Sequence, residues 1–124
     1  MLQFKQNTYQ KGKSAEDLAS RYLGQRGLTL LTRNYRSRRG EIDLIMQDGD
    51  VIVFVEVRSR KNSRAMNVIE SINSEKCTRI IQTSQQYLQN RKQPDECTCR
   101  FDIVLITGQA DATQIEWIKN AFEA

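Results

Sequence analysis

The sequence of 124 residues predicts an α/β domain: one mixed sheet of about four to five strands flanked by helices, in the order αβββαβα. Three observations predict this fold. Segments with helical apolar spacing alternate with short segments rich in Val, Ile and Phe. A turn at residues 48–50 joins two strand-like segments into a hairpin. A helical segment at 71–90 then separates the third strand from the fourth, as in a crossover between parallel strands.

The first helix is expected over residues 12–26. Ser14 can cap its N-terminus, and apolar residues recur behind it at helical spacing. Gly27 ends the helix, because glycine is favoured just beyond a helix C-terminus. Gly40 forms a turn between the first two strands. Three strands are expected in this part of the chain, over residues 28–36, 41–47 and 51–59.

The second half of the chain continues the alternation. The helix at 71–90 ends before Pro94, and residues 100–107 form a fourth strand, parallel to the third. Residues 113–122 are expected to form a short amphipathic helix. No linker or repeat divides the chain, so we expect a single domain over residues 1–124, with 1–11 as a flexible N-terminal segment.

The composition excludes several kinds of chemistry. The chain has no histidine and three cysteines, so a disulfide framework or a structural zinc site is not expected. The absence of histidine also removes Ser-His and Cys-His nucleophiles, so catalysis would need carboxylates, lysine, arginine or a metal ion. No apolar segment reaches the ~18 residues that span a bilayer, and residues 1–13 lack the core of a signal peptide. We therefore expect a cytoplasmic protein with no membrane partner.

Basic residues bracket the central hairpin. The formal net charge is only +4, so the distribution of charge is more informative than its sum. A basic cluster of this kind is either a solvated surface or a nucleic-acid contact. The basic residues on the two sides of the hairpin are Arg33, Arg36, Arg38 and Arg39 before it, and Arg58, Arg60, Lys61 and Arg64 after it.

Two acidic residues, Asp43 and Glu56, lie inside strands that otherwise carry apolar side chains. With a turn centred on Gly49, the hairpin register places Asp43 opposite Val55 or Glu56, so the two carboxylates lie side by side. Carboxylates at this spacing repel each other unless a positive charge lies between them. A divalent hard cation would satisfy this requirement, with the backbone carbonyl of Val57 as a further ligand.

A structural explanation for the two acids is equally open. Asp43 can pair with Arg58 or Arg36, and Glu56 with Arg60, which would make the set a ladder of ion pairs. Under that explanation the acids stabilise the fold and hold no metal.

Strand alternation also predicts which side chains share a face. Ile42, Leu44 and Met46 should lie together on the face opposite Asp43. Arg100 and Asp102 share one face of the fourth strand, and we expect them to have a structural role, paired with each other or with the basic cluster. Glu41, directly after Gly40, is expected at a turn or on the surface.

The order of several motifs resembles the YraN family. The segment 40–45, GEIDLI, is followed by 53–60, VFVEVRSR; a helix with Gly12 and Glu16 and the pair Arg33-Asn34 precede them, and Lys76 and 100–102, RFD, follow. The resemblance covers residues 12–107. That family is similar in fold to the archaeal Holliday junction resolvases, within the PD-(D/E)xK nuclease superfamily. The resemblance therefore implies a restriction-endonuclease-like sheet and a single nuclease-like domain.

The resemblance implies a site residue by residue. Asp43 matches the first metal-binding aspartate of the superfamily, and Glu56 matches its second acidic ligand. Glu16 matches the acidic residue on the first helix that points toward the same metal cluster in resolvase-like members. Arg58 stands at the place of the motif's lysine. The implied cofactor is Mg²⁺ or Mn²⁺, which lowers the pKa of a bound water so that no histidine base is required.

The implied activity is hydrolysis of phosphodiesters in branched or otherwise structured DNA. A homodimer is also implied, because resolvases of this type cut two strands symmetrically. Basic residues would neutralise the phosphates. Those expected to contact DNA are Arg36, Arg38, Arg39, Arg60, Lys61, Arg64 and Lys76.

Arg58 departs from the motif and leaves alternatives open. If the motif's lysine must lose and regain a proton, arginine cannot replace it, because a guanidinium stays charged. If the lysine only supplies positive charge, arginine serves. The alternatives to a nuclease are a nucleic-acid-binding domain with the same fold but no catalytic activity, and an interaction domain whose charged residues only satisfy one another.

Overall fold

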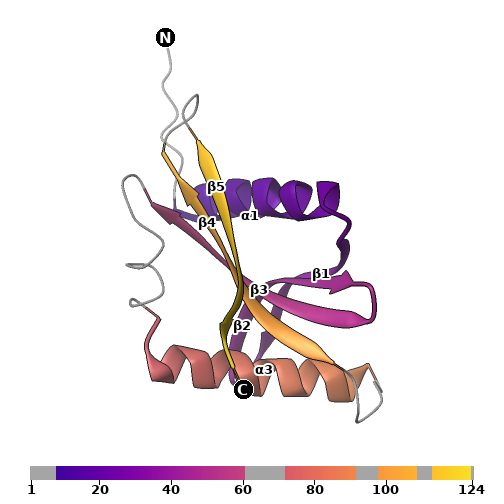
Figure 1. Ribbon diagram of the computed structural model, residues 1–124. Coiled ribbons are helices and arrows are strands. Elements are labelled where there is room, and N and C mark those ends of the chain that lie inside the picture. Colours follow the sequence, from indigo (N-terminus) through magenta and orange to yellow (C-terminus); the bar gives the residue numbers. More distant parts are fainter. Residues whose placement is uncertain (1–7, 61–71, 92–97, 109–112, 124) are drawn as a thin grey trace.

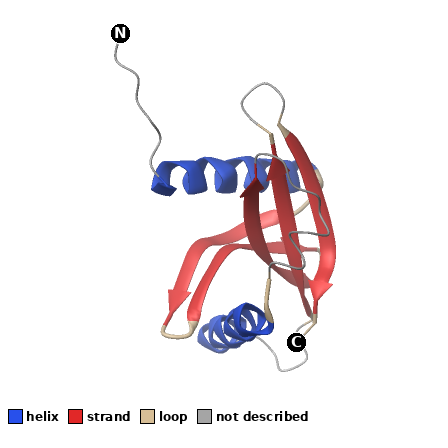
Figure 2. Cartoon of the chain, turned by 90° about the vertical axis from the view of Figure 1, so that its left-hand side faces the viewer, coloured by secondary structure: helices blue, strands red, loops and turns tan. Residues whose placement is uncertain are grey.

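The computed structural model describes residues 8–60, 72–91, 98–108 and 113–123. They form a five-stranded mixed sheet with one helix on each face, so the predicted α/β fold with a sheet of four to five strands is confirmed (Figures 1 and 2). Among the described residues, no helix is long and apolar enough to cross a membrane. The elements are α1 (Thr8–Gln25), β1 (Thr29–Ser37), β2 (Gly40–Asp48), β3 (Val51–Arg60), α3 (Ser74–Asn90), β4 (Cys99–Thr107) and β5 (Gln114–Phe122).

The strands lie in the sheet in chain order. β1, β2 and β3 form an antiparallel meander, and Gly49, with a φ of 61°, occupies the left-handed conformation that the tight turn between β2 and β3 requires. β4 is parallel to β3, and α3 lies in the crossover between them, as predicted. β5 then pairs antiparallel with β4 and forms the second edge of the sheet.

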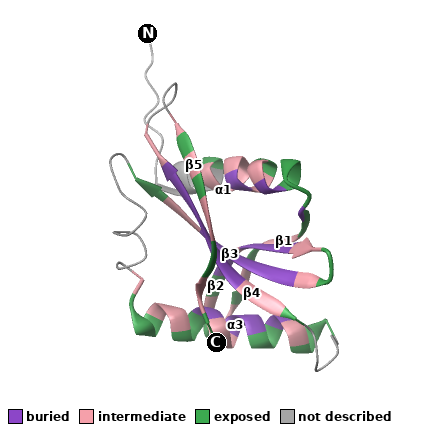
Figure 3. Cartoon of the chain, viewed as in Figure 1, coloured by how far each residue is buried: buried purple, intermediate pink, exposed green. Residues whose placement is uncertain are grey.

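The two helices cover opposite faces of the sheet and bury separate apolar clusters (Figure 3). On the α1 side, Ala19 and Leu23 pack on Val53 and Val55 of β3 and on neighbouring strands. Because β3 is covered on both faces, its alternate side chains are apolar on both, and its central residues are buried. This burial raises the free-energy cost of any charged side chain in β3.

On the α3 side, Tyr87 is the aromatic centre of the cluster. Its ring makes edge contacts with Tyr35 and Phe54, with ring centroids 5.2 Å and 6.1 Å apart. Ile80 and Phe101 complete this part of the cluster. The contacts hold α3 mainly against β1 and β2.

Both helices begin at residues other than those predicted. α1 begins at Thr8, so Ser14 lies inside the helix and is not its N-cap, which corrects the prediction. α3 begins at Ser74 and not at residue 71. Its N-cap is Asn73, whose side-chain oxygen accepts a hydrogen bond from the Lys76 N–H at 2.8 Å.

The last element is a strand, β5, which corrects the amphipathic helix predicted over 113–122. Its pairing with β4 shifts at a β-bulge, where Asn120 adopts a positive φ of 51°. The apolar residues Ile115, Ile118 and Phe122 fall three and four positions apart, which imitates helical spacing. Ile115 and Ile118 pack in different clusters, and the bulge lies between Ile118 and Phe122.

Buried Asp102 holds this bulge in place. Its carboxylate, which is 0% exposed, accepts hydrogen bonds from Arg100 Nε at 3.0 Å, Trp117 Nε1 at 2.9 Å and the Asn120 N–H at 3.0 Å. The predicted pairing of Arg100 with Asp102 is thus confirmed. The bonds from Trp117 and Asn120 to Asp102 join β5 to β4, in a structural part of the sheet.

Strand β2 changes its packing at Asp43. Leu44 and Met46 pack in the α1 cluster, whereas Ile42 packs in the α3 cluster, so the predicted common face of these three residues is wrong. Asn34 of β1 lies opposite this point and has a positive φ of 52°, a conformation that interrupts the regular alternation of a strand. The irregularity places Asp43 at a break in the otherwise continuous apolar surface of β2.

Candidate metal centre

Asp43 and Glu56 lie where β2 and β3 separate. The last paired residues of the two strands are Leu44 and Val55, so Asp43 and Glu56 are the next residues on their strands, as the hairpin register predicted. Beyond this pair, the Asp43 side chain takes the place of a strand partner: its Oδ2 accepts a hydrogen bond from the Val57 N–H at 2.8 Å.

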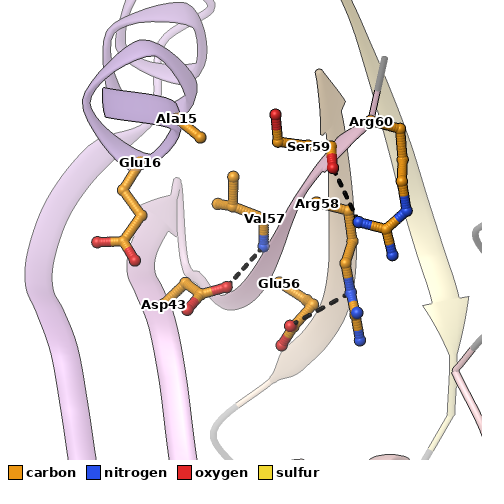
Figure 4. A pocket seen from close by; sticks show the side chains of 8 residues that line it. All are labelled: Ala15, Glu16, Asp43, Glu56, Val57, Arg58, Ser59 and Arg60. Carbon is orange, nitrogen blue, oxygen red and sulfur yellow. Dashed lines mark hydrogen bonds and ion pairs between the residues drawn. The ribbon is translucent and has the colours of Figure 1, made fainter. Parts of the chain in front are cut away.

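A pocket of about 260 Å³ opens at this separation. Figure 4 shows residues from three elements around it: Glu16 on α1, Asp43 on β2, and the end of β3. The fold thus brings together residues that lie 40 positions apart in the sequence, from 16 to 56. Its lining residues are Ala15, Glu16, Asp43, Glu56, Val57, Arg58, Ser59 and Arg60.

Glu56 is the most strongly perturbed acid of the pocket. Its side chain is only 9% exposed, and burial, followed by the neighbouring charge of Asp43, raises the pKa of Glu56 to about 7. Lys76 and Arg58 lower that pKa, but by less than burial raises it. Glu56 is therefore a carboxylate that gains or loses its proton close to neutral pH.

Asp43 is half-buried, and its partial burial raises its pKa. The Val57 N–H opposes this shift, because a hydrogen bond to a carboxylate favours its charged form. Among the described residues, no lysine or arginine nitrogen lies within 4.0 Å of the Asp43 carboxylate. Asp43 is thus a half-buried acid whose negative charge has no direct cationic partner in the described part of the chain.

The predicted ladder of ion pairs is wrong in its partners. Arg58 lies beside Glu56 and not beside Asp43: its Nε is 3.5 Å from Glu56 Oε1. Arg36 pairs with Glu41 at 3.6 Å, and both are exposed, as expected for Glu41. Arg60 donates from Nη1 to the backbone carbonyl of Ser59 at 2.8 Å.

Lys76, in the first turn of α3, also contacts Glu56, on the face of the sheet that α3 covers. Its Nζ lies 3.7 Å from Glu56 Oε1. Glu56 is therefore shared between a guanidinium on its own strand and an ammonium on the crossover helix. Lys76 thereby places a flexible, partly exposed positive charge at the edge of the pocket.

Glu16 extends the acidic lining onto α1. Its side chain is 13% exposed, and burial, followed by the charge of Asp43, raises its pKa. Arg33 Nη2 lies 3.8 Å from Glu16 Oε1 and 2.6 Å from an oxygen of Asp17. Sequence reasoning did not predict the Arg33 contact, because it depends on how α1 packs against β1.

The residues of the pocket fit a hard divalent cation with several open coordination positions. Within the described part of the chain, no three His, Cys, Asp or Glu side chains form a metal-binding group, so protein side chains alone would supply two ligands, Asp43 and Glu56. Mg²⁺ is commonly held by one or two carboxylates together with water and phosphate oxygens. The Val57 carbonyl points to the same strand edge as its N–H, toward Asp43, and suits the role of third ligand.

The predicted basic residues have different positions. Arg38 and Arg39 are exposed in the turn between β1 and β2, and Arg60 is exposed at the end of β3. Lys61 and Arg64 lie outside the described residues. The basic residues are therefore distributed on two sides of the acidic pocket: along β3 and α3, and at the turn before β2.

The fold and the acidic pocket define a restriction-endonuclease-like α/β domain. The chain belongs to the uncharacterised protein family UPF0102, whose profile matches residues 15–106. This is the YraN family, of the PD-(D/E)xK-like nuclease superfamily, so the resemblance found in the sequence is confirmed.

Similar proteins of this family cover nearly the whole chain. The UPF0102 protein of Nitrosococcus oceani is 47% identical over 112 residues, which is 90% of this chain and 90% of that protein. The UPF0102 protein of Nitrosomonas europaea is 48% identical over 113 residues, 91% of this chain and 93% of that protein. That of Stutzerimonas stutzeri is 44% identical over 113 residues, 91% and 94% of the two chains. The similarity thus includes the α1, β2 and β3 segments that carry the pocket.

Proposed function

We propose that the protein is a divalent-metal-dependent endonuclease that hydrolyses phosphodiesters in branched or structured DNA. The observation that supports this most strongly is the position of Asp43: a half-buried carboxylate, open to a pocket, beside the buried carboxylate of Glu56 and without a direct cationic partner among the described residues. Burying such a charge costs several kcal/mol unless a positive charge offsets that cost. We therefore expect an acid of this kind where it binds a ligand.

Asp43 and Glu56 would hold Mg²⁺ or Mn²⁺, with the Val57 carbonyl as the neighbouring main-chain ligand. The cation, when bound, polarises a phosphodiester and lowers the pKa of a bound water. Glu16, on the α1 side, would orient water through its half-buried carboxylate. This donor set uses only oxygens, in agreement with a chain that contains no histidine.

The positive groups would act on the phosphate. Arg58 lines the pocket and can stabilise negative charge that develops on the phosphate oxygens. Arg60 is exposed beside it and can neutralise an adjacent phosphate. Cutting two strands symmetrically would require two copies of the chain, so we include a homodimer in the proposal.

A second candidate function is nucleic-acid binding without cleavage. Arg58, which cannot give up its proton, stands where the superfamily motif has lysine. Glu56 is in addition already paired with both Arg58 and Lys76. These two contacts could prevent Glu56 from binding a metal ion. The protein would then keep a basic surface that binds DNA but does not cut it.

One experiment tests both candidates. A labelled four-way junction and a linear duplex are incubated with the protein in EDTA, in Mg²⁺ and in Mn²⁺, and binding and cleavage are recorded by native and denaturing gels. The proposed function predicts binding in all three conditions, preferring the junction, and cleavage only with metal. Binding without cleavage in any condition would support the second candidate.

Matched variants assign the activity to the pocket. The double variant Asp43→Asn, Glu56→Gln should abolish cleavage and preserve junction binding, because it removes the ligand charges and leaves the basic residues in place. Glu41→Gln is the control, since Glu41 is a nearby but exposed acid. Cleavage that persists in the double variant at the wild-type rate would show that another site or a contaminant is responsible.

A further inference from the structure

A second pocket lies between α3 and the turn that joins β1 to β2. Its volume is about 260 Å³. It combines one guanidinium, from Arg39, with four carboxamides, and no carboxylate among the described residues lines it. Positions three and four apart share one face of a helix, so the carboxamides form one surface. They belong to Gln82, Gln85, Gln86 and Gln89.

The fold holds Arg39 over this surface. The turn approaches α3 so closely that a Cβ added to Gly40 would lie 3.2 Å from Thr83 Oγ1 and 3.4 Å from the Cβ of Arg79. In addition, the Arg39 N–H donates a hydrogen bond to Ser37 Oγ at 3.0 Å. The backbone of Arg39 is thus positioned by contacts within the turn and against the helix.

Helix α3 extends from the metal centre to this pocket. Lys76, in its first turn, has its Nζ 3.7 Å from Glu56 Oε1, and the glutamines of the pocket begin six residues further along, on another side of the helix. Nine residues of helix rise about 14 Å, so Lys76 and Gln85 are separated along the helix axis by a few nucleotides of an extended strand. A strand with one phosphate at the metal centre would cross the helix to reach the pocket.

We propose that this pocket binds an unpaired nucleotide of the strand that leaves the metal centre. The inference rests on the proposed function and adds a second contact to it. Arg39 would neutralise a phosphate, and each carboxamide offers a donor and an acceptor together, which is the pattern that hydrogen bonding to a base edge requires.

The pocket suits an unpaired base better than a duplex. In a duplex the Watson–Crick edges are occupied, whereas an unpaired base can turn toward protein amides. The pocket is also smaller than the ~300–1,000 Å³ of typical small-molecule sites, which fits one unit of a polymer. Branched DNA with unpaired nucleotides near the junction is a substrate that would use both pockets.

Fluorescence anisotropy in EDTA tests the inference, since DNA is not cleaved without metal. Two probes are compared: a linear duplex, and the same duplex with a single-stranded tail. The test variants are Gln82→Ala with Gln86→Ala, and Arg39→Gln. The matched controls are Gln25→Ala and Arg21→Gln, which change exposed residues of the same types on α1.

We expect the double glutamine variant to weaken binding of the tailed probe about tenfold or more, since each lost hydrogen bond corresponds to about fivefold. Its binding of the duplex should change less than twofold. Arg39→Gln should weaken binding of the tailed probe and reduce the slope of log affinity against log salt by about one. The control variants should bind both probes as the wild type does.

Three results would overturn the inference. If both test variants bind the tailed probe with the same affinity as the wild type, the pocket does not contact DNA. Equal weakening of both probes by the glutamine variant would show that the carboxamides do not read unpaired bases. Absence of binding by the wild-type protein would remove the proposed function as well, whereas the first two results leave it intact. If the first glutamine pair lowers the melting temperature, the more exposed pair Gln85→Ala with Gln89→Ala replaces it.

Discussion

The buried charge of Glu56 predicts an unusual dependence of stability on pH. The pKa of Glu56 is raised from 4.5 to about 7, so the folded protein binds this proton more tightly than the unfolded chain does. The contribution of Glu56 to stability is therefore fully present below pH 4.5 and is lost as the pH rises through about 7. Burial raises the pKa of Asp43 also, so Asp43 acts in the same direction.

The magnitude follows from the shift. A change from 4.5 to about 7 is about 2.5 pH units, and each unit corresponds to ~1.4 kcal/mol, which gives about 3 kcal/mol. Glu56→Gln removes the charge while it keeps the size and polarity of the side chain. We expect this variant to exceed the wild type in unfolding free energy by up to about 3 kcal/mol at pH 8. For a chain of this length that corresponds to about 10 °C in melting temperature.

The assay is thermal or urea unfolding in EDTA between pH 4 and pH 9, for the wild type, Glu56→Gln and the control Glu41→Gln. The difference between the wild type and Glu56→Gln isolates Glu56 from all other titrating groups. The difference should be small at pH 4, where Glu56 is protonated, and should grow between pH 5 and pH 8 as Glu56 ionises. Lys76 and Arg58 lose their partner in the variant, but both remain partly accessible to water. A difference that does not change with pH would refute the reasoning, as would a lower stability of Glu56→Gln at pH 8.

Three further predictions follow from the same structure. Arg58→Gln should move the midpoint of this pH-dependent difference upward, because Arg58 lowers the pKa of Glu56; an unmoved midpoint in the same unfolding series would contradict the contact. Asp102→Ala should destabilise the protein by about 3–5 kcal/mol in urea unfolding, because it leaves the donors of Trp117 and Asn120 without their acceptor and Arg100 with Asp48 alone; a loss below 1 kcal/mol would contradict the role given to this acid. Gly40→Ala should lower the unfolding free energy by about 1–3 kcal/mol, because the added Cβ would crowd Thr83, and unchanged stability would show that the turn adjusts freely.

The sequence predicted most of the sheet because its strands are locally specified. The turn at 48–50 sets the register of β2 and β3, and that register alone placed Asp43 beside Glu56. The length of the helical segment before β4 predicted a parallel crossover, which the pairing of β3 with β4 confirms. These features depend on neighbouring residues and on chain connectivity, which a single sequence contains.

The failures occur where tertiary contacts override a local pattern. β5 was predicted as a helix because its apolar residues fall three and four positions apart, and the acid that fixes the bulge at Asn120, Asp102, comes from another strand. At β2, the left-handed conformation of Asn34 on the neighbouring strand breaks an alternation that the sequence of β2 does not interrupt.

The partners of the site residues were also beyond local reasoning. Sequence spacing suggested Arg60 for Glu56, but the fold supplies Arg58 and Lys76. It brings Lys76 there because Lys76 lies in the first turn of α3, which Asn73 caps. The spacing of two residues along one strand predicts a shared face, but it cannot predict which helix end will contact that face.

The most direct test of the central claim is calorimetric titration of Mn²⁺ into the metal-free protein at pH 7.5. We expect one site for each chain, lost in Asp43→Asn and in Glu56→Gln, and retained in Glu41→Gln. Because the pKa of Glu56 is near 7, binding should also release a fraction of a proton, which appears as a dependence of the heat on the buffer. No Mn²⁺ binding by the wild type, or equal binding by Asp43→Asn and Glu56→Gln, would contradict a metal centre at the point where β2 and β3 separate.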